Sequence, residues 1–516
     1  MVRPGLQHSC EGGRTVSVQG YNPRTGEPFG DPLEATSDTE VDRLCEVAHS
    51  AFEVWSGRGA EDRARVLDLV ADRLDENSET LISVCDSETA LGVPRLTTEL
   101  KRTTNQLRMF ADVLREGSYV EAMIDSPDMD IIPPRPDVRR VLRPIGMIAV
   151  YSASNFPFAL STVGSDTASA LAAGCAVVVK GHSAHPNTTR ETARVVSEAL
   201  AEGGAPEGLF SVIYGTQSGV RLVQHPLVKA AGFTGSIGGG RALYDLANSR
   251  PDPIPFYGEL GSVNPTVILP GAAAERAEEI AAGFAQSVTM GVGQFCTNPG
   301  LVFAPSSIVD SLGKAVAESN GGAMLNERMC DSYRSHVEAL SNNDLVSLVA
   351  TGTAPDEAWA GKPALFSVPL ETFVANQETL TEENFGPAGI VVTYSDVADV
   401  LPVLSTLPGT LTGTVHASPS EHKEAAAVAA ELHKIAGRLI YNGWPTGIAL
   451  AWAMQHGGPW PATTNAIHTS IGVPGIYRWL SPVTYQTWPD ELLPPELQDA
   501  NPLGITRRRD GVLAKH

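Results

Sequence analysis

The chain has 516 residues, which is too long for one hydrophobic core, so we expect two or three domains. Its formal charge of −22 argues against a nucleic-acid binder, which needs a basic face to neutralise phosphates. The six cysteines are widely spaced without a CxxC pair, and we find neither an apolar leader segment nor an apolar run of membrane-spanning length. We therefore expect a cytoplasmic protein with free thiols and no membrane or nucleic-acid partner.

The first half of the chain changes from helical to alternating patterning. Residues 39–116 carry apolar side chains at three- and four-residue spacing and predict helices. A proline-rich connector, residues 126–147, is expected to be extended. Beyond it, β-branched runs alternate with helical stretches, which predicts βαβ units and a parallel sheet. The predicted elements are strands over 146–153, 175–181, 209–215 and 228–235, with helices to about Ala173 and from Asn187 to Glu202.

The alternation restarts near residue 260. The run "NPTVILP" predicts a strand, and a long helix is expected from Ala273 to Met290. The predicted fold is therefore α/β, with two doubly wound, Rossmann-like domains. The basic C-terminal segment "ITRRRDGVLAKH" is expected to be a mobile tail.

Two candidate functional residues lie in contrasting settings. Cys296 stands alone in the polar, glycine-rich stretch "GVGQFCTNPG", and the stretch by itself leaves a buried structural thiol and a nucleophile equally open. Lys180 ends a predicted strand. In a doubly wound sheet, ligands bind beyond such strand ends, although a solvated turn lysine is the alternative.

The remaining candidates also follow predicted strands. The turn "FTGSIGGG", which contains Gly235, Ser236 and Gly240, opens a helix whose N–H groups could face phosphate, although it lacks the GxGxxG pattern and could be a simple turn. Asn155 could donate to an oxyanion or cap a helix. Glu259 could be a general base or a surface carboxylate.

Together these residues supply a thiol, an amide donor, a carboxylate and a dinucleotide platform, which suit covalent oxidation of a carbonyl compound. The 12 histidines form no HExxH or related ligand spacing, so no metal site is predicted.

Six motifs occur in the order in which they appear in the aldehyde dehydrogenase superfamily, and from about residue 20 to 490 the chain resembles that superfamily. The motifs are "SNFP", "VVVKGHS", "FTGSIGGG", "GELGSVNP", "GQFCTNPG" and "EENFGP". The stretches "ELGSVNP", "GQFCTNPG" and "NGWPTG…HGGPWPAT" further resemble the branch that contains α-ketoglutarate semialdehyde (2,5-dioxopentanoate) dehydrogenases and the NADP-dependent fatty aldehyde dehydrogenase of luminous bacteria.

The resemblance implies a role for each catalytic candidate. Cys296 would attack the aldehyde, and the Asn155 amide and the Cys296 backbone N–H would hold the oxyanion. Hydride would pass to the nicotinamide, leaving a thioester on Cys296. Glu259 would then activate the water that hydrolyses the thioester to a carboxylic acid.

Cofactor roles follow from the same resemblance. Lys180 would bind the adenosine ribose, and the glycine-rich turn would approach the pyrophosphate. Glu383 would bind the nicotinamide ribose, with Phe385 packed at the nicotinamide end. Ser183 stands where NAD-preferring members often carry a glutamate. Because a carboxylate there would repel a 2′-phosphate, we expect NADP to be preferred, with NAD as the alternative.

The substrate remains open between two classes. The branch implies 2,5-dioxopentanoate or a related semialdehyde, but Ile467 and Ser481 stand where its dioxopentanoate members carry arginines. Phe156, Trp444 and Trp452 are either core packing or the wall of an apolar tunnel for fatty or aromatic aldehydes. A CoA-acylating enzyme and a catalytically silent structural homologue are further alternatives. The retained Glu259 disfavours the first, and the retained Cys296 and Glu259 disfavour the second.

The resemblance also implies three structural parts. Residues 1–125 and 148–259 would bind the cofactor, and residues 260–475 would form the catalytic domain. Residues 126–147 and 476–516 would form a small bridging sheet. Because exposed sheet edges invite pairing, we expect a homodimer or homotetramer.

Overall fold

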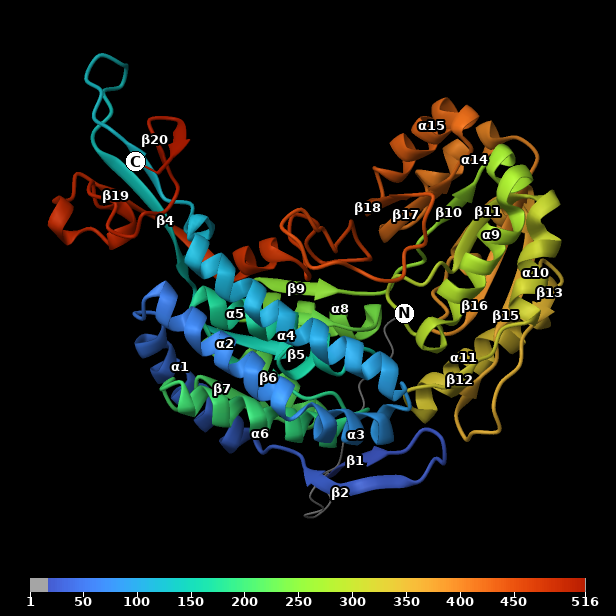
Figure 1. Ribbon diagram of the computed structural model, residues 1–516, viewed down its shortest axis with the longest axis horizontal. Helices are drawn as coiled ribbons and strands as arrows, with labels where there is room; N and C mark the ends of the chain where they lie inside the picture. Colours follow the sequence, from blue (N-terminus) through green and yellow to red (C-terminus); the bar gives the residue numbers. More distant parts are fainter. Residues whose placement is uncertain (1–16, 516) are drawn as a thin grey trace.

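The computed structural model describes residues 17–515 as a mixed α/β fold with two large sheets and a projecting arm (Figure 1). Cys10 and the N-terminal stretch, in which no leader is expected, lie outside the described residues. Among the helices of residues 17–515, none combines the length and apolar character that crossing a membrane would require.

The first sheet has five parallel strands in the order β7-β6-β5-β8-β9. The chain adds strands outward from β5 first on one side of the sheet and then on the other, so the sheet is doubly wound. This order confirms the predicted fold class. The strands are β5 (Met147–Tyr151), β6 (Ala176–Lys180), β7 (Phe210–Ile213), β8 (Val228–Thr234) and β9 (Phe256–Glu259).

Helices cover both faces of this sheet, which is why its central strands are almost continuously apolar. One face carries α1 (Asp38–Trp55), α7 (Thr216–Gln224) and α8 (Ile237–Asn248). The other carries α5 (Ser165–Ala173) and α6 (Pro186–Glu202), with α2 (Ala60–Glu76), α3 (Ser78–Thr89) and α4 (Val93–Glu116) packed outside them.

The second sheet has seven strands in the order β13-β15-β16-β11-β10-β17-β18, parallel except for the β13–β15 pair. The strands are β10 (Thr266–Ile268), β11 (Leu301–Pro305), β13 (Ser347–Thr351), β15 (Ala364–Pro369), β16 (Ala388–Tyr394), β17 (Thr410–His416) and β18 (Ala436–Tyr441). One face packs on α9 (Pro270–Thr289) and α10 (Val309–Ala317). The other packs on α11 (Glu327–Ser341), α12 (Leu370–Ala375), α14 (Val397–Leu404) and α15 (His422–Leu432).

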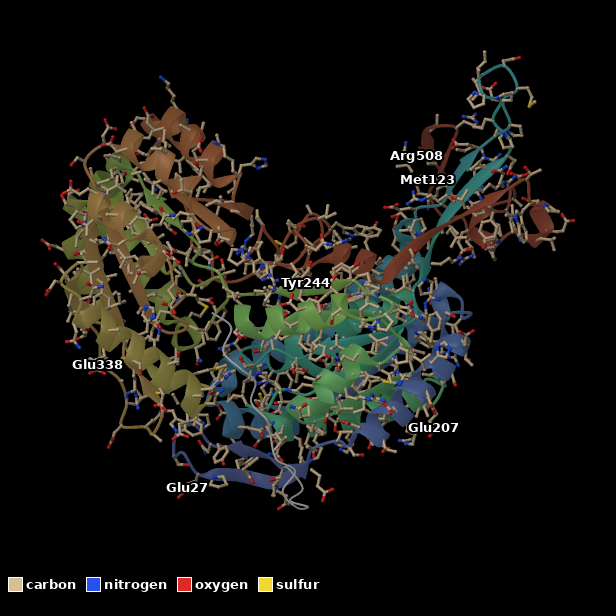
Figure 2. All side chains as sticks on the ribbon, turned by 180° about the vertical axis from the view of Figure 1, so that it is seen from behind. Glu27, Met123, Glu207, Tyr244, Glu338 and Arg508 are labelled. Carbon is tan, nitrogen blue, oxygen red and sulfur yellow. The ribbon has the colours of Figure 1, made fainter. Side chains whose placement is uncertain are left out.

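The arm is a five-stranded sheet in the order β19-β4-β3-β20-β21. It joins β3 (Met123–Asp125) and β4 (Val138–Pro144) to β19 (Leu480–Gln486), β20 (Arg507–Arg509) and β21 (Val512–Ala514). The expectation of a mobile C-terminal tail is wrong, because Arg508 pairs with Met123 in the sheet (Figure 2) and Ile505 packs into the core beside Gly117.

An N-terminal hairpin and a long irregular loop lie outside these three sheets. An N-terminal hairpin, β1 (Ser17–Tyr21) and β2 (Pro28–Glu34), was not predicted. A long loop, residues 442–472, runs between the two large sheets without regular helix or strand (Figure 1). We call it the crossing loop.

Candidate active site

Four predicted site residues meet at one edge of the first sheet. Asn155 follows β5, Lys180 ends β6, Ser236 follows β8 and caps α8, and Glu259 ends β9. Because all five strands are parallel, their carboxyl ends share this edge, which is where ligands bind in doubly wound folds.

Cys296 lies between α9 and β11, at the amino end of the second sheet, in residues 290–300. We call this segment the cysteine loop. Gly293 in this loop has φ +68°, and a Cβ there would lie 2.2 Å from the Gly386 backbone. Asn264 holds the loop from the other side, because its Nδ2 donates to the Cys296 carbonyl at 2.8 Å and to the Asn298 carbonyl at 2.9 Å. Sequence reasoning missed Asn264, although it stands in "GELGSVNP".

A buried cluster joins the thiol to the carboxylate through a histidine. His456 Nε2 lies 2.8 Å from Glu259 Oε1 and 3.5 Å from Cys296 Sγ. Ser470 Oγ donates to the other oxygen of Glu259. Since a carboxylate only accepts hydrogen bonds, His456 Nε2 carries a proton in this contact. Both His456 and Ser470 come from the crossing loop, and neither was predicted from the sequence.

The pKa values of the two buried acidic groups, Cys296 and Glu259, are shifted in opposite directions. Burial raises the pKa of the Cys296 thiol well above its usual range, and the neighbouring Glu259 charge adds to the rise. Burial would also raise the pKa of Glu259, but His456 and Ser470 together hold that pKa below its ordinary value. The resting pair is therefore a neutral thiol beside a carboxylate, which is the arrangement of a nucleophile and its base.

Asn155 is positioned against the cysteine loop. Its Nδ2 donates to the Gln294 carbonyl at 2.9 Å, and Arg95 Nη2 donates to its backbone oxygen at 2.6 Å. Because an amide nitrogen carries two hydrogens, one can serve an oxyanion while the other keeps this anchor.

The same three reactive side chains also resemble a metal-ligand set. The ligand atoms of Cys296, Glu259 and His456 all lie within 4.8 Å of one another. Sequence analysis predicted no metal site. His456 Nε2 and Glu259 Oε1 are joined directly by their hydrogen bond, and this contact is a route for proton transfer between them.

The residues predicted to bind the dinucleotide lie at the carboxyl ends of strands in the first sheet and differ in their exposure. Gly235, Ser236 and Ser183 are exposed, and the Ser236 side chain accepts from the Gly239 N–H at 3.3 Å. Lys180 is half-buried at the strand end. Gly240 differs from the prediction. It is buried, and a Cβ there would lie 2.2 Å from Leu260, so its small size serves helix packing.

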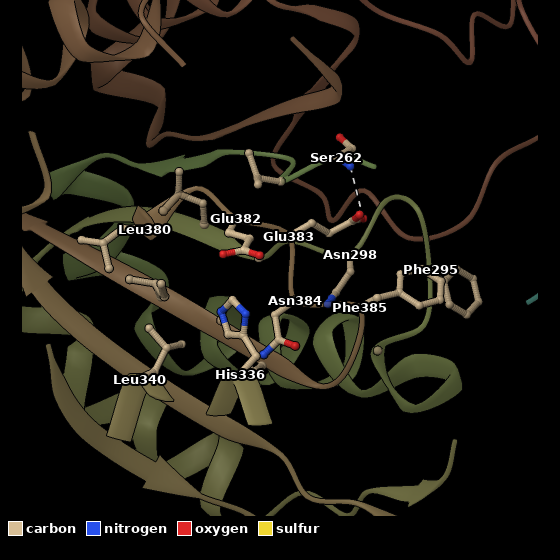
Figure 3. A pocket seen from close by; sticks show the side chains of 17 residues that line it. Ser262, Phe295, Asn298, His336, Leu340, Leu380, Glu382, Glu383, Asn384 and Phe385 are labelled. Carbon is tan, nitrogen blue, oxygen red and sulfur yellow. Dashed lines mark hydrogen bonds between the residues drawn. The ribbon is translucent and has the colours of Figure 1, made fainter. Parts of the chain in front are cut away.

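A pocket with a mixed polar and apolar lining surrounds Glu383, before the amino end of β16 (Figure 3). The Ser262 N–H donates to Glu383 Oε1 at 3.2 Å, and burial raises the pKa of Glu383 to about 7. Within residues 17–515, Asn384 Nδ2 and Asn298 Oδ1 are buried here without a partner. Phe385 also lines the pocket. Polar atoms awaiting partners beside a carboxylate fit a hydroxyl-bearing ligand such as a ribose.

The three aromatic residues predicted to line the substrate pocket lie in different surroundings. Phe156 packs against the small apolar cluster of Ala153, Leu160 and Ile471 and meets Phe295 edge-on at a ring distance of 5.0 Å. Trp444 instead packs on Phe284 of α9 and on His416, at ring distances of 5.5 and 4.8 Å. Trp452 is 51% exposed. The two tryptophans therefore contribute core packing and surface, and only Phe156 lies next to the cysteine loop.

The chain is similar to known proteins over most of its length. The model of the aldehyde dehydrogenase family matches residues 11–459. The chain is 42% identical to alpha-ketoglutaric semialdehyde dehydrogenase 2 of Azospirillum brasilense, over 97% of each chain. It is 41% identical to alpha-ketoglutaric semialdehyde dehydrogenase of Acinetobacter baylyi, over 97% of this chain and 96% of the relative.

Solved structures show the same fold. Betaine aldehyde dehydrogenase from Staphylococcus aureus, in complex with NAD+, is similar with a TM-score of 0.78 at 21% identity, over 92% of each chain. A mutant of aldehyde dehydrogenase C from Pseudomonas syringae, in complex with NAD+ and octanal, is similar with a TM-score of 0.77 at 20% identity, over 91% of this chain and 93% of that chain. By its sequence match over most of its length, this chain belongs to the aldehyde dehydrogenase family.

Proposed function

We propose that this enzyme oxidises 2,5-dioxopentanoate, or a related semialdehyde, to the carboxylic acid and releases the product by hydrolysis. The observation that carries the reaction is the buried Cys296–His456–Glu259 cluster beside Asn155. The substrate class rests on the two relatives named for this semialdehyde, each more than 40% identical over nearly the whole chain.

The cluster accounts for thiol activation. The Cys296 thiol, protonated at rest, gives its proton to the Glu259–His456 pair as sulfur attacks the aldehyde carbon. The Asn155 amide and the Cys296 N–H then stabilise the oxyanion, and each such donor contributes about 3 kcal/mol. When bound, an oxidised nicotinamide would supply the acceptor for the hydride that leaves the substrate as the oxyanion collapses to the thioester.

Hydrolysis uses the same carboxylate. Once Glu259 is ionised again, it takes a proton from the water that attacks the Cys296 thioester, and the thiolate leaves. Retention of this buried base favours water over CoA as the acyl acceptor, and it disfavours the catalytically silent alternative.

The cofactor residues divide between the two sheets. Lys180 and the Gly235–Ser236 turn would hold the adenosine and pyrophosphate, while Glu383 and Phe385 would hold the nicotinamide end. Residues 1–125 and 148–259, which contain Lys180 and the Gly235–Ser236 turn, would form the cofactor domain. Residues 260–475, which contain Cys296, would form the catalytic domain and contribute Glu383 and Phe385 to the cofactor site. Residues 126–147 and 476–516 would form the bridging arm.

NADP is the proposed preference, because Ser183 is exposed and uncharged near Lys180. Ser183→Glu should then weaken NADP binding relative to NAD through repulsion of the 2′-phosphate. An unchanged ratio of kcat/KM for the two dinucleotides would place recognition of that phosphate elsewhere.

The direct test of function is a steady-state panel with 2,5-dioxopentanoate, a short and a long aliphatic aldehyde and an aromatic aldehyde, each with NAD and NADP. The proposal requires the highest kcat/KM for 2,5-dioxopentanoate and a carboxylic acid product without added CoA. A lead for the long aliphatic or aromatic aldehyde would support the alternative, an apolar-aldehyde dehydrogenase.

A further inference from the structure

An open groove of about 750 Å³ runs between α4 and the crossing loop. One face of α4 forms its polar wall, with Thr98, Lys101, Arg102 and Asn105 at helical spacing. Residues 448–450 form its apolar wall. Lys101 is already paired with Asp75 at 3.2 Å, so its charge is largely balanced.

Arg102 differs from Lys101, because its charge has no direct partner. Within residues 17–515 it makes no ion pair, and its Nε and Nη2 are buried without a hydrogen-bond acceptor. The neighbouring carboxylate of Glu99 faces other partners. Its Oε1 accepts from the Phe158 and Ala159 N–H groups, and its Oε2 pairs with Arg95 Nη2 at 3.9 Å. Because an arginine stays protonated in proteins, these two donors carry a positive charge that a bound anion would balance.

The position of Arg102 links the groove to the reacting atoms. Its guanidinium lies over the Phe156 ring, 5.9 Å from the centroid. Phe156 follows the oxyanion residue Asn155 and contacts Phe295, which precedes Cys296. Burial lowers the pKa of Arg102, and the nearby charges of Glu99 and Glu259 counteract that effect.

We propose that Arg102 binds the carboxylate of the substrate, so that a semialdehyde lies along the groove with its aldehyde at Cys296 and its acid end at this guanidinium. Bidentate pairing with a carboxylate would satisfy the unpartnered donors. This inference rests on the proposed function and identifies what recognises the acid end, a role for which Ile467 and Ser481 offer no charge.

The test compares three five-carbon aldehydes: 2,5-dioxopentanoate, 5-oxopentanoate and pentanal. Only the first two carry a carboxylate. Arg102→Gln should raise KM for both acids by about 10- to 100-fold, the effect expected for losing a hydrogen-bonded charge, and leave kcat/KM for pentanal within about twofold. Arg102→Lys should show a smaller rise, because it keeps the charge but not the fork.

Arg108→Gln is the matched control. It removes the same charge from the same helix, but Arg108 pairs with Asp72 and Asp75 and does not line the groove. It should leave the preference for acids unchanged. Activity on pentanal reports that each variant is folded. If Arg102→Gln does not fold, Arg102→Lys tests the proposal.

The two possible failures differ. If the wild type prefers the acids but Arg102→Gln lowers all three activities equally, or none, Arg102 does not bind the carboxylate and the proposed substrate class stands. If the wild type prefers pentanal, the proposed substrate class fails, and the carboxylate site fails with it.

Discussion

At the scale of single residues, the protonation state of each reactive group depends on its burial and on its hydrogen-bond partners. Cys296 keeps its proton because burial and the neighbouring Glu259 charge outweigh the opposing charge of Arg438. Glu259 keeps its charge because His456 and Ser470 both contact its oxygens. His456 sits between the two and can stabilise either anion through one N–H.

Glu259→Gln should separate the two halves of the reaction. Without a carboxylate, His456 Nε2 is free to accept the thiol proton, so the first turnover should proceed and produce a burst of reduced cofactor. Hydrolysis should slow by about 10²- to 10⁴-fold, the typical contribution of a general base. Stopped-flow absorbance of the reduced cofactor measures both phases, and a variant that loses the burst would show that the thiol also depends on Glu259.

Glu383 should make the stability of the cofactor-free protein depend on pH. Its pKa rises from 4.5 to about 7 on burial, so the native carboxyl holds a proton that the unfolded chain releases. Stability should therefore fall as pH rises between those two values, by about 3 kcal/mol in all. Glu383→Gln should unfold at a higher temperature than wild type at pH 8 but at the same temperature at pH 4.5. Equal midpoints at both pH values would contradict this assignment.

At the scale of elements, two irregular segments bring the site together. The cysteine loop rests directly on the Gly386 backbone, and the crossing loop carries His456 and Ser470 to Glu259 at the end of β9. Strands supply the platform, and loops supply the reacting groups that must approach from another domain.

Gly293→Ala should disrupt the cysteine loop. Its Cβ would overlap the Gly386 backbone, and φ is +68°, so the loop must shift by an amount that costs about 2 to 4 kcal/mol locally. We expect activity to drop at least 100-fold and thiol labelling of Cys296 to change in rate.

Gly300→Ala is the matched control in the same loop, because a Cβ there meets only the Val263 carbonyl, at 3.7 Å. It should retain activity close to wild type. Equal losses in both variants would mean that the loop tolerates no added carbon at all, and the specific contact with Gly386 would lose its importance.

At the scale of the whole molecule, the arm leaves apolar surface uncovered. Of the 21 large hydrophobic side chains exposed within residues 17–515, nine lie in its two segments: Met129, Ile131, Ile132, Val483, Trp488, Leu492, Leu503, Val512 and Leu513. Together with the edge strands β19 and β21, this surface is typical of an interface. We propose that a second copy of the chain covers it.

Leu513→Asp should weaken that assembly. Leu513 is 61% exposed in the single chain, so the substitution costs little in folding but places a charge in the proposed interface. Light scattering after size exclusion should show a smaller species than wild type, whereas Val54→Asp, at an exposed position on α1, should not change the mass. A wild type that is monomeric at micromolar concentration would contradict the proposed assembly.

The sequence by itself determined the regular elements and most of the strand-end residues. Periodicity and turn residues are local, so α6 and α9 lie within a few residues of their predicted bounds, and Asn155, Lys180 and Glu259 stand at the strand ends where they were expected. Residue types at those ends also indicated the class of chemistry, which the family match supports.

Only the tertiary structure decided which distant residues share the site. His456 lies 160 residues from Cys296 along the chain, and Ser470 lies 211 from Glu259. No local pattern in the irregular crossing loop distinguishes such partners from Trp444, which packs on α9 instead. The basic tail became a strand for the same reason, because strand pairing with β3 depends on a neighbour that sequence periodicity cannot identify.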